Sequence, residues 1–70
     1  MYKTFTVKAD PINPTLPSIE VCINGNVYKI KREEEIYACE TKAEMNELKK
    51  KGLPVVPMAV FEALKNNGSI

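Results

Sequence analysis

The dipeptide Asn24-Gly25 constrains this chain more than any other feature, because short apolar runs flank it on both sides. Asn-Gly is the favoured centre of a type I′ turn, in which both central residues adopt positive φ. Apolar runs joined by such a turn are the strongest short-range signal of a β-hairpin. The segment 19–31 is therefore predicted to fold back on itself as two antiparallel strands.

The register of this hairpin is open between two turns. A type I′ turn at Asn24-Gly25 places Glu20 opposite Lys29, an opposite-charge pair that favours this register. A type II′ turn at Gly25-Asn26 is the rival. Both registers put the same apolar residues on one face, so the expected core face does not depend on the choice. The residues of that face are Ile19, Val21, Ile23, Tyr28 and Ile30.

Two shorter strands are expected on either side of the hairpin. Phe5 and Val7 alternate with threonines, which predicts a half-buried strand over 2–8. Residues 36–39 are apolar and rich in strand formers, which predicts another short strand. The charge run 31–35 between them is expected to be solvated, as a strand extension or a turn.

A helix is predicted over 42–51. Thr41 and Glu44 fit a capping box, in which each residue bonds to the other's backbone N–H. Gly52 suits the left-handed position that follows a helix end. Leu48 is expected on the buried side of this helix, over the hairpin.

A second helix is predicted over 57–66, because Pro57 suits the first helical position. The preceding residues 53–57 are expected to be extended, since each proline biases its predecessor away from helical geometry. Phe61 and Leu64 would form the apolar side of the helix. The expected fold is α+β, a single domain with a small antiparallel sheet built on the central hairpin and followed by two short helices.

Three prolines stand at every third position in the loop 9–18. Proline fixes φ at about −65° and donates no N–H, so this loop cannot be a central strand. An ordered but irregular connection is expected. Its Ile12 and Leu16 need a surface to cover. Either they close over the protein's own core, or the loop is an arm that docks on a partner.

Few residues could carry catalysis. Histidine is absent, which removes the commonest activating base and metal ligand. Asp10 is the one aspartate, and the glutamates at 33–35 are expected to be exposed and to titrate normally. No glycine-rich phosphate-binding motif is present. We expect a protein that is not an enzyme, with no cofactor and no metal, and with Cys22 and Cys39 as reduced thiols.

The charge and hydropathy of the chain limit its partners. The net charge is +1 at pH 7, so the whole molecule has no strong attraction for nucleic acid or anionic lipid. No apolar run approaches the roughly 18 residues of a membrane span, and the N-terminus lacks the apolar region of a signal peptide. Cytoplasmic synthesis is expected, with neither a membrane nor a small-molecule substrate as partner.

The strand around Thr4-Phe5-Thr6-Val7, the hairpin and the helix that begins Thr41-Lys42-Ala43-Glu44 follow one another in this order. This order resembles small accessory proteins of tailed bacteriophages, including those encoded near the head genes of Mu-like prophages. The resemblance implies a virion or assembly role without catalysis, and a final location in the virion. The three-proline loop and the Pro57 helix depart from that pattern, and no site residue is carried over.

We expect a non-enzymatic protein–protein interaction module whose partner is another subunit of the same protein or a capsid, tail or host protein. A small sheet with free edges tends to pair with other chains. The candidate partner-binding residues are Ile12, Leu16, Asn24, Gly25, Lys29 and Lys31.

Two other functions remain open. In a nucleic-acid-binding regulator, Lys29, Lys31 and Arg32 would join Lys49 to Lys51 in one basic face, and Tyr28 or Tyr37 would stack on bases. In a phage-encoded inhibitor of a host protein, the surface would recognise an enzyme instead of a virion component. The sequence favours neither over the interaction module.

Overall fold

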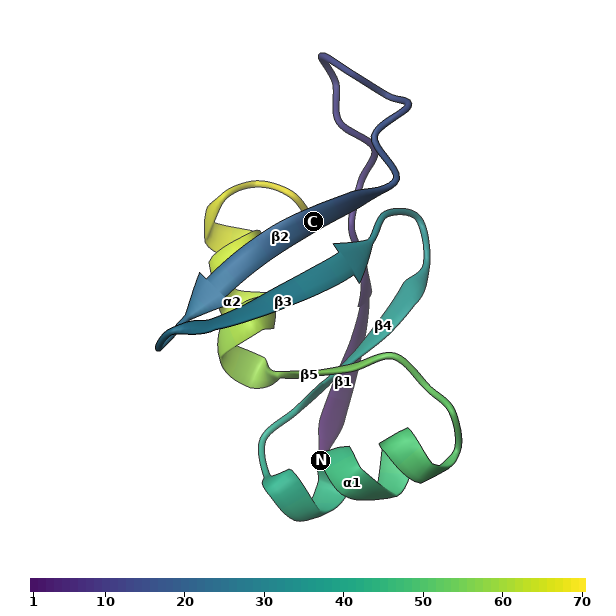
Figure 1. Ribbon diagram of the computed structural model, residues 1–70, viewed down its shortest axis with the longest axis vertical. Coiled ribbons are helices and arrows are strands. Elements are labelled where there is room, and N and C mark those ends of the chain that lie inside the picture. The colour runs from purple at the N-terminus through teal and green to yellow at the C-terminus, as the bar shows by residue number, and fades with distance from the viewer.

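The computed structural model describes residues 1–70 and contains five strands and two helices (Figure 1). In chain order the elements are β1 (Tyr2–Thr6), β2 (Ser18–Ile23), β3 (Asn26–Lys31), β4 (Glu35–Cys39), α1 (Lys42–Lys50), β5 (Val55–Pro57) and α2 (Met58–Asn66). The predicted α+β class is confirmed. Neither helix is long and apolar enough to cross a lipid bilayer.

The hairpin forms as predicted, in the register of the type I′ turn. Asn24 and Gly25 have φ angles of 49° and 81°, the left-handed pair that this turn requires. Ile23 lies opposite Asn26, and Glu20 lies opposite Lys29. The type II′ alternative is therefore wrong.

The strands form two sheets. β2 and β3 pair only with each other, while β1, β4 and β5 form a second sheet with β4 in the middle. β1 is antiparallel to β4, but β5 runs parallel to it. The sequence predicted only an extended segment at β5. Its one proline, Pro57, is compatible with a strand because β5 lies at the edge of the sheet, where a missing N–H that points away from β4 leaves no ladder bond unmade.

A tight turn separates the two sheets. Glu33, between β3 and β4, has φ of 66°, a left-handed conformation that is uncommon for a residue with a side chain. Its backbone N–H donates to the Val7 carbonyl at 2.9 Å. The charge run at 31–35 is therefore part strand and part turn. Lys31 ends β3, Glu35 begins β4, and the turn at 32–34 directs β4 away from β3 and onto β1.

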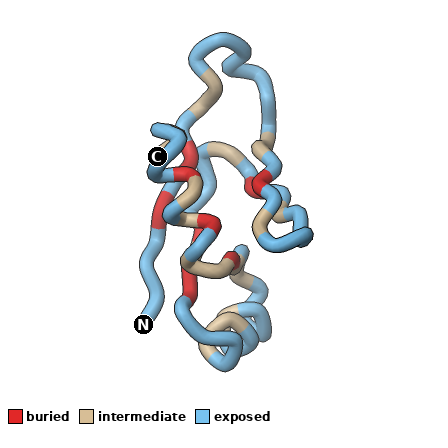
Figure 2. Tube along the Cα trace, turned by 90° about the vertical axis from the view of Figure 1, so that its left-hand side faces the viewer, coloured by how far each residue is buried: buried red, intermediate tan, exposed pale blue.

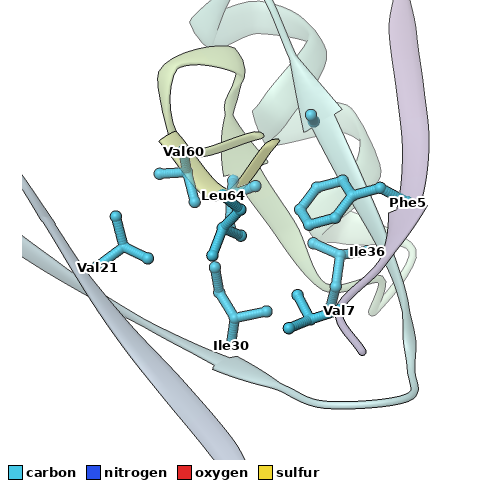
Figure 3. Close-up of a cluster of buried hydrophobic side chains, with 9 residues drawn as sticks. Phe5, Val7, Val21, Ile30, Ile36, Val60 and Leu64 are labelled. Atoms are coloured by element: carbon cyan, nitrogen blue, oxygen red, sulfur yellow. The ribbon is translucent and has the colours of Figure 1, made fainter. Parts of the chain in front are cut away.

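Helix α2 joins the two sheets in one core (Figure 3). Val60 and Leu64 are four residues apart, so they lie on one side of the helix, and both are fully buried. The helix packs against β2 of the hairpin and against β4 and β5 of the other sheet. The buried cluster consists of Phe5, Val7, Val21, Ile30, Ile36, Ala38, Val56, Val60 and Leu64.

The predicted core face of the hairpin is confirmed. Val21 and Ile30 are buried, and Ile19, Ile23 and Tyr28 are half-buried against the same cluster. The expected cover by Leu48 is wrong. Helix α1 has no buried residue and packs at the far end of the three-stranded sheet, on β4 and β5, because its nine residues include only three apolar ones.

The beginning of helix α1 uses half of the predicted capping box. The Thr41 hydroxyl accepts the backbone N–H of Glu44 at 3.3 Å. The Glu44 carboxylate does not return to Thr41, because it pairs with the α-amino group of Met1 at 3.1 Å. The strand β1 thereby brings the N-terminus of the chain against α1.

Both helices end in the same way. The C-terminal turn of α1 has the two Schellman bonds, from Leu53 N–H to the Leu48 carbonyl and from Gly52 N–H to the Lys49 carbonyl. Gly68 closes α2 with the equivalent pair. The predicted first residue of α2 is wrong by one position. Pro57 is the N-cap, in extended geometry, because it still belongs to β5.

Candidate partner-binding site

The loop between β1 and β2 projects from the body of the molecule, and we call its residues 9–17 the proline arm. It stands at the top of Figure 1, beyond the hairpin, and most of it is exposed (Figure 2). Exposed loops of this kind are usually mobile. The proline arm instead contains a set of hydrogen bonds that order it from within.

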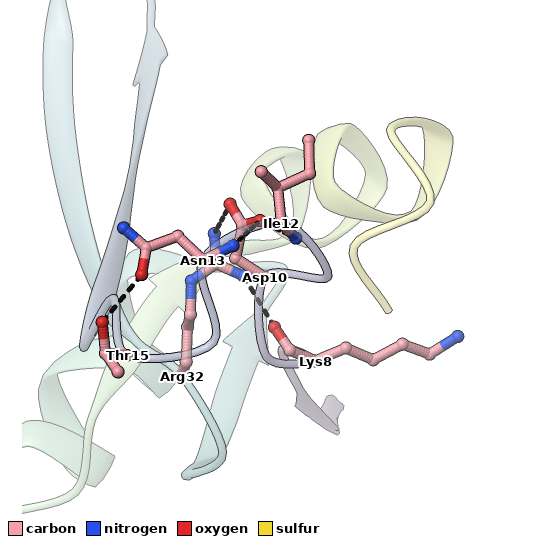
Figure 4. Close-up of polar contacts among 6 residues, drawn as sticks. All are labelled: Lys8, Asp10, Ile12, Asn13, Thr15 and Arg32. Carbon is pink, nitrogen blue, oxygen red and sulfur yellow. Dashed lines mark hydrogen bonds and ion pairs between the residues drawn. The ribbon is translucent and has the colours of Figure 1, made fainter.

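Asp10 organises the first half of the arm (Figure 4). Its Oδ1 accepts the backbone N–H of Ile12 at 2.8 Å and that of Asn13 at 3.1 Å. An aspartate that accepts backbone bonds two and three residues ahead forms an Asx turn. These bonds from Asn13 and Ile12, and next the nearby charge of Arg32, hold the pKa of Asp10 below its usual value.

A second turn follows at 13–16. The Leu16 N–H donates to the Asn13 carbonyl at 3.1 Å, and Pro14 occupies the position where its fixed φ suits such a turn. The Thr15 hydroxyl also donates to the Asn13 side chain at 2.7 Å. Two consecutive turns with proline in each leave the arm little freedom.

Arg32 fastens the base of the arm to the hairpin. Its Nη1 donates to the Lys8 carbonyl at 2.6 Å, and its Nη2 lies 3.8 Å from Asp10 Oδ2. Its own backbone N–H donates to the carbonyl of Pro17 at 2.9 Å. One residue thus holds both ends of the arm, and its side chain is only 11% exposed. Its Nε is buried without a hydrogen-bond partner.

The arm presents apolar side chains to solvent. Ile12 is 93% exposed and Leu16 is 41% exposed. The prediction that they close over the protein's own core is therefore wrong for Ile12, which has no surface to cover. An isolated exposed apolar residue is ordinary. Ile12 differs from such a residue because backbone bonds at Ile12 and Asn13 order the segment that exposes it.

The other predicted partner-binding residues do not join this site. Asn24 and Gly25 form the exposed turn of the hairpin, at the opposite end of β2 from the arm. Lys29 and Lys31 lie on the outer face of β3, and they line a groove that contains no arm residue. The candidate partner-binding residues therefore lie on three separate surfaces, which are the proline arm, the hairpin turn and the outer face of β3.

Several residues of the basic face expected for nucleic acid are engaged in other contacts or lie beside carboxylates. Arg32 is occupied at the base of the arm, and Glu34 and Glu35 line the same groove as Lys29 and Lys31. The two tyrosines are occupied as well. Tyr28 is half-buried against the core. Tyr37 stacks on Tyr2 with ring centroids 5.4 Å apart.

The side chains with reactive or titratable groups are dispersed. Cys22 and Cys39 are both free, the first exposed and the second buried, and burial raises the pKa of the Cys39 thiol. The Tyr37 hydroxyl donates to Glu35 at 3.2 Å, and this bond raises the pKa of the phenol. No three His, Cys, Asp or Glu side chains cluster in a way that could hold a metal ion.

Sequence reasoning missed Arg32 as the residue that orders the arm. It stands in a run of charged residues and was expected to be solvated. The only local signal is Asp10, which precedes a proline and could have indicated an Asx turn. The partner of that turn lies 22 residues further along the chain, and nothing in the sequence fixes that distance.

Comparisons of this chain with protein-family models, with curated proteins and with solved structures gave no match.

Proposed function

We propose that this protein is a non-enzymatic protein–protein interaction module, and that the proline arm makes the contact. The carrying observation is that Ile12, at 93% exposure, lies in a segment ordered by Asp10 and anchored by Arg32. A preformed segment loses little conformational freedom on binding, which favours association.

The proposal extends to the setting of the protein. The resemblance to small accessory proteins of tailed bacteriophages supports a virion or assembly role, with capsid or tail subunits as partners. A chain of 70 residues buries little surface by itself, and docking on a larger assembly supplies more. Inhibition of a host protein is the alternative, and it would use the same apolar arm.

Site-specific photo-crosslinking in the native host tests this proposal. A photoreactive amino acid replaces Ile12 in one variant and Lys42, an exposed residue at the start of α1, in the control. We expect one defined protein adduct from position 12 and none from position 42. Identification of the adduct distinguishes a virion component from a host enzyme.

A substitution completes the test. Ile12→Asp leaves every backbone bond of the arm in place, so the fold should be unchanged, and we expect loss of the complex that was identified by crosslinking. Ala59→Asp is the matched control, since Ala59 is also an exposed apolar residue, on α2 and away from β3. Equal loss of binding in both variants, or an adduct with nucleic acid in place of protein, would contradict the proposal.

A further inference from the structure

A groove lies between the two sheets, and no residue of α2 lines it. It encloses about 550 Å³ and lies between β3, the turn before β4 and the segment that leads into β5. No residue of β2 lines it, so the groove faces the outer edge of β3. Its apolar lining residues are Ile30, Ile36, Leu53, Val55 and Val56.

The edge of β3 directs unpaired backbone groups into this groove. In an antiparallel pair, residues alternate between those that bond to the partner strand and those that point away from it. The Arg32 N–H bonds to the Pro17 carbonyl, one position beyond the Ser18–Lys31 pair. The alternation then assigns Lys29 and Lys31 to the outward-pointing set. Their N–H and C=O groups face away from β2.

The edge of β5 also directs unpaired backbone groups into the groove, from the wall opposite β3. Tyr37 lies opposite Val55, and the Tyr37 N–H bonds to the carbonyl of the preceding residue, Pro54. In a parallel pair a residue bonds to the neighbours of the residue that it faces, so the N–H and C=O of Val55 point away from β4. Val55 lines the groove.

We propose that this groove binds an extended segment of a partner protein as an added β-strand. The added strand would use the free backbone groups of Lys29, Lys31 and Val55, and it would connect the two sheets across their open edges. Strand addition of this kind draws affinity from main-chain bonds and specificity from alternate side chains. The inference rests on the proposed function, because it takes a protein as the ligand.

The two faces of β3 define the side chains of that segment. Ile30 points into the core, and Lys29 and Lys31 lie on the outer face. Glu20 stands opposite Lys29 across the hairpin, but no carboxylate lies within ion-pair distance of either lysine. Residues of an added strand alternate in the same way. Those beside Ile30 must be apolar, and those directly beside the lysines in the ladder are best matched by glutamate or aspartate. Glu34 and Glu35 also line the groove, so the acidic preference is limited to positions that neighbour Lys29 and Lys31 on the β3 side.

Two copies of this chain are not expected to pair through their β3 edges. Pairing of two β3 edges would place the lysines of one copy against the lysines of the other, and like charges directly opposite each other are destabilising. Lysines on an edge strand also prevent self-association in other sheets. We therefore take the occupant to be a segment of a different protein, with alternating apolar and acidic residues.

A defined peptide tests the proposal on the intact protein. The probe is acetyl-Thr-Val-Glu-Val-Glu-Val-Thr-amide, and its isomer Thr-Val-Val-Glu-Glu-Val-Thr has the same composition without the alternation. We expect the alternating peptide to slow hydrogen exchange of the Lys29, Lys31 and Val55 amides by about tenfold or more. The isomer should leave these amides unchanged.

Two variants locate the binding. Val55→Pro removes the one N–H of β5 that faces the groove and leaves the β4 pairing intact, so the peptide should bind more weakly. Lys29→Glu combined with Lys31→Glu turns two attractive pairs into repulsive ones and should weaken binding at least about tenfold. Lys42→Glu combined with Lys65→Glu changes the net charge equally, away from the groove, and should bind as the wild type does.

The proposal is overturned if the alternating peptide does not bind, if its isomer binds equally well, or if the β3 charge reversals have no effect. Protection confined to the free edges of β1 or β2 overturns it as well. Crosslinking at position 12 is independent of the groove. An arm adduct without peptide binding therefore refutes the groove alone, and peptide binding without an arm adduct refutes the arm.

Discussion

The conformation of the proline arm depends on one side chain, that of Arg32. A guanidinium presents several N–H groups in a fixed plane, so it can bond to the Lys8 carbonyl and face Asp10 at the same time. Lysine carries a single ammonium point and cannot reproduce that geometry. Since Arg32 also bonds to Pro17 through its backbone, the side chain secures the departing end of the arm and the main chain secures the returning end.

Arg32→Lys is therefore expected to loosen the proline arm without unfolding the protein. The amides of Ile12, Asn13 and Leu16 should exchange faster with solvent, while the β2–β3 amides remain protected. The loss of a charged bond to a carbonyl at an exposed position should lower the free energy of unfolding by about 1 kcal/mol or less. Lys31→Arg, on the outer face of the same strand, is the control. Equal exchange of the arm amides in both variants would show that Arg32 does not order the arm.

The order of the arm is expected to depend on pH through Asp10. The pKa of this carboxyl is lowered by the N–H groups of Asn13 and Ile12. A lowered pKa means that the contribution of the carboxylate is complete above the usual aspartate pKa of about 4 and is lost as pH falls through the lowered value.

Amide chemical shifts measure this titration. The Ile12 and Asn13 N–H signals should move together, with a midpoint below the usual aspartate value, because protonation weakens both acceptor bonds. Asp10→Asn keeps an acceptor oxygen but has no titrating group, so the Ile12 and Asn13 amide shifts of that variant should not change with pH. A midpoint at or above the usual value in the wild type would show that the turn does not form in solution.

At the scale of elements, the parts that were predictable are those with local causes. The Asn24-Gly25 turn fixes its own register through two positive φ angles, and Thr41 and Gly52 mark the limits of α1 within one turn. The pairing of β5 with β4 has no such marker. It depends on where α1 delivers the chain, and Pro54 and Pro57 argue against a strand until its edge position is known.

The same reasoning explains the one wrong assignment of a helix face. Leu48 has the right spacing for a buried position, but spacing does not reveal which surface a helix meets. Helix α2 offers Val60, Phe61 and Leu64 within five residues, and it occupies the space beside the hairpin. Helix α1 remains at the far end with half-buried Met45 and Leu48.

The end of α1 provides a test at this scale. Gly52 has φ of 79°, and nothing lies within 4 Å of the position that a Cβ would occupy. Gly52→Ala therefore adds backbone strain and no collision, and we expect the free energy of unfolding to fall by about 1 kcal/mol in urea titrations. Gly52→Asn should lose less, because asparagine tolerates the left-handed region. An alanine variant as stable as the wild type would contradict the Schellman ending.

At the scale of the whole molecule, two small sheets share one helix. A two-stranded hairpin is marginal alone, and three strands need a covered apolar face. Helix α2 supports the hairpin and covers the apolar face of the three-stranded sheet, because Val60 and Leu64 contact a cluster drawn from the hairpin and from β1, β4 and β5. The two sheets are therefore expected to unfold together, although no strand of one bonds to a strand of the other. The groove between their free edges exists because the link is made by the helix and not by a ladder.

Leu64→Ala tests this dependence. Leu64 is fully buried, so its truncation should cost about 2–5 kcal/mol, comparable with the entire stability of a domain of this size. We expect a largely unfolded variant in which amides of the hairpin and of the three-stranded sheet lose protection to the same extent. Leu48→Ala, which truncates a half-buried leucine on α1, should retain both sheets. If Leu64→Ala released the hairpin while β1 and β4 stayed protected, the sheets would be separate folding units, and an added strand would have to pair with one of them alone.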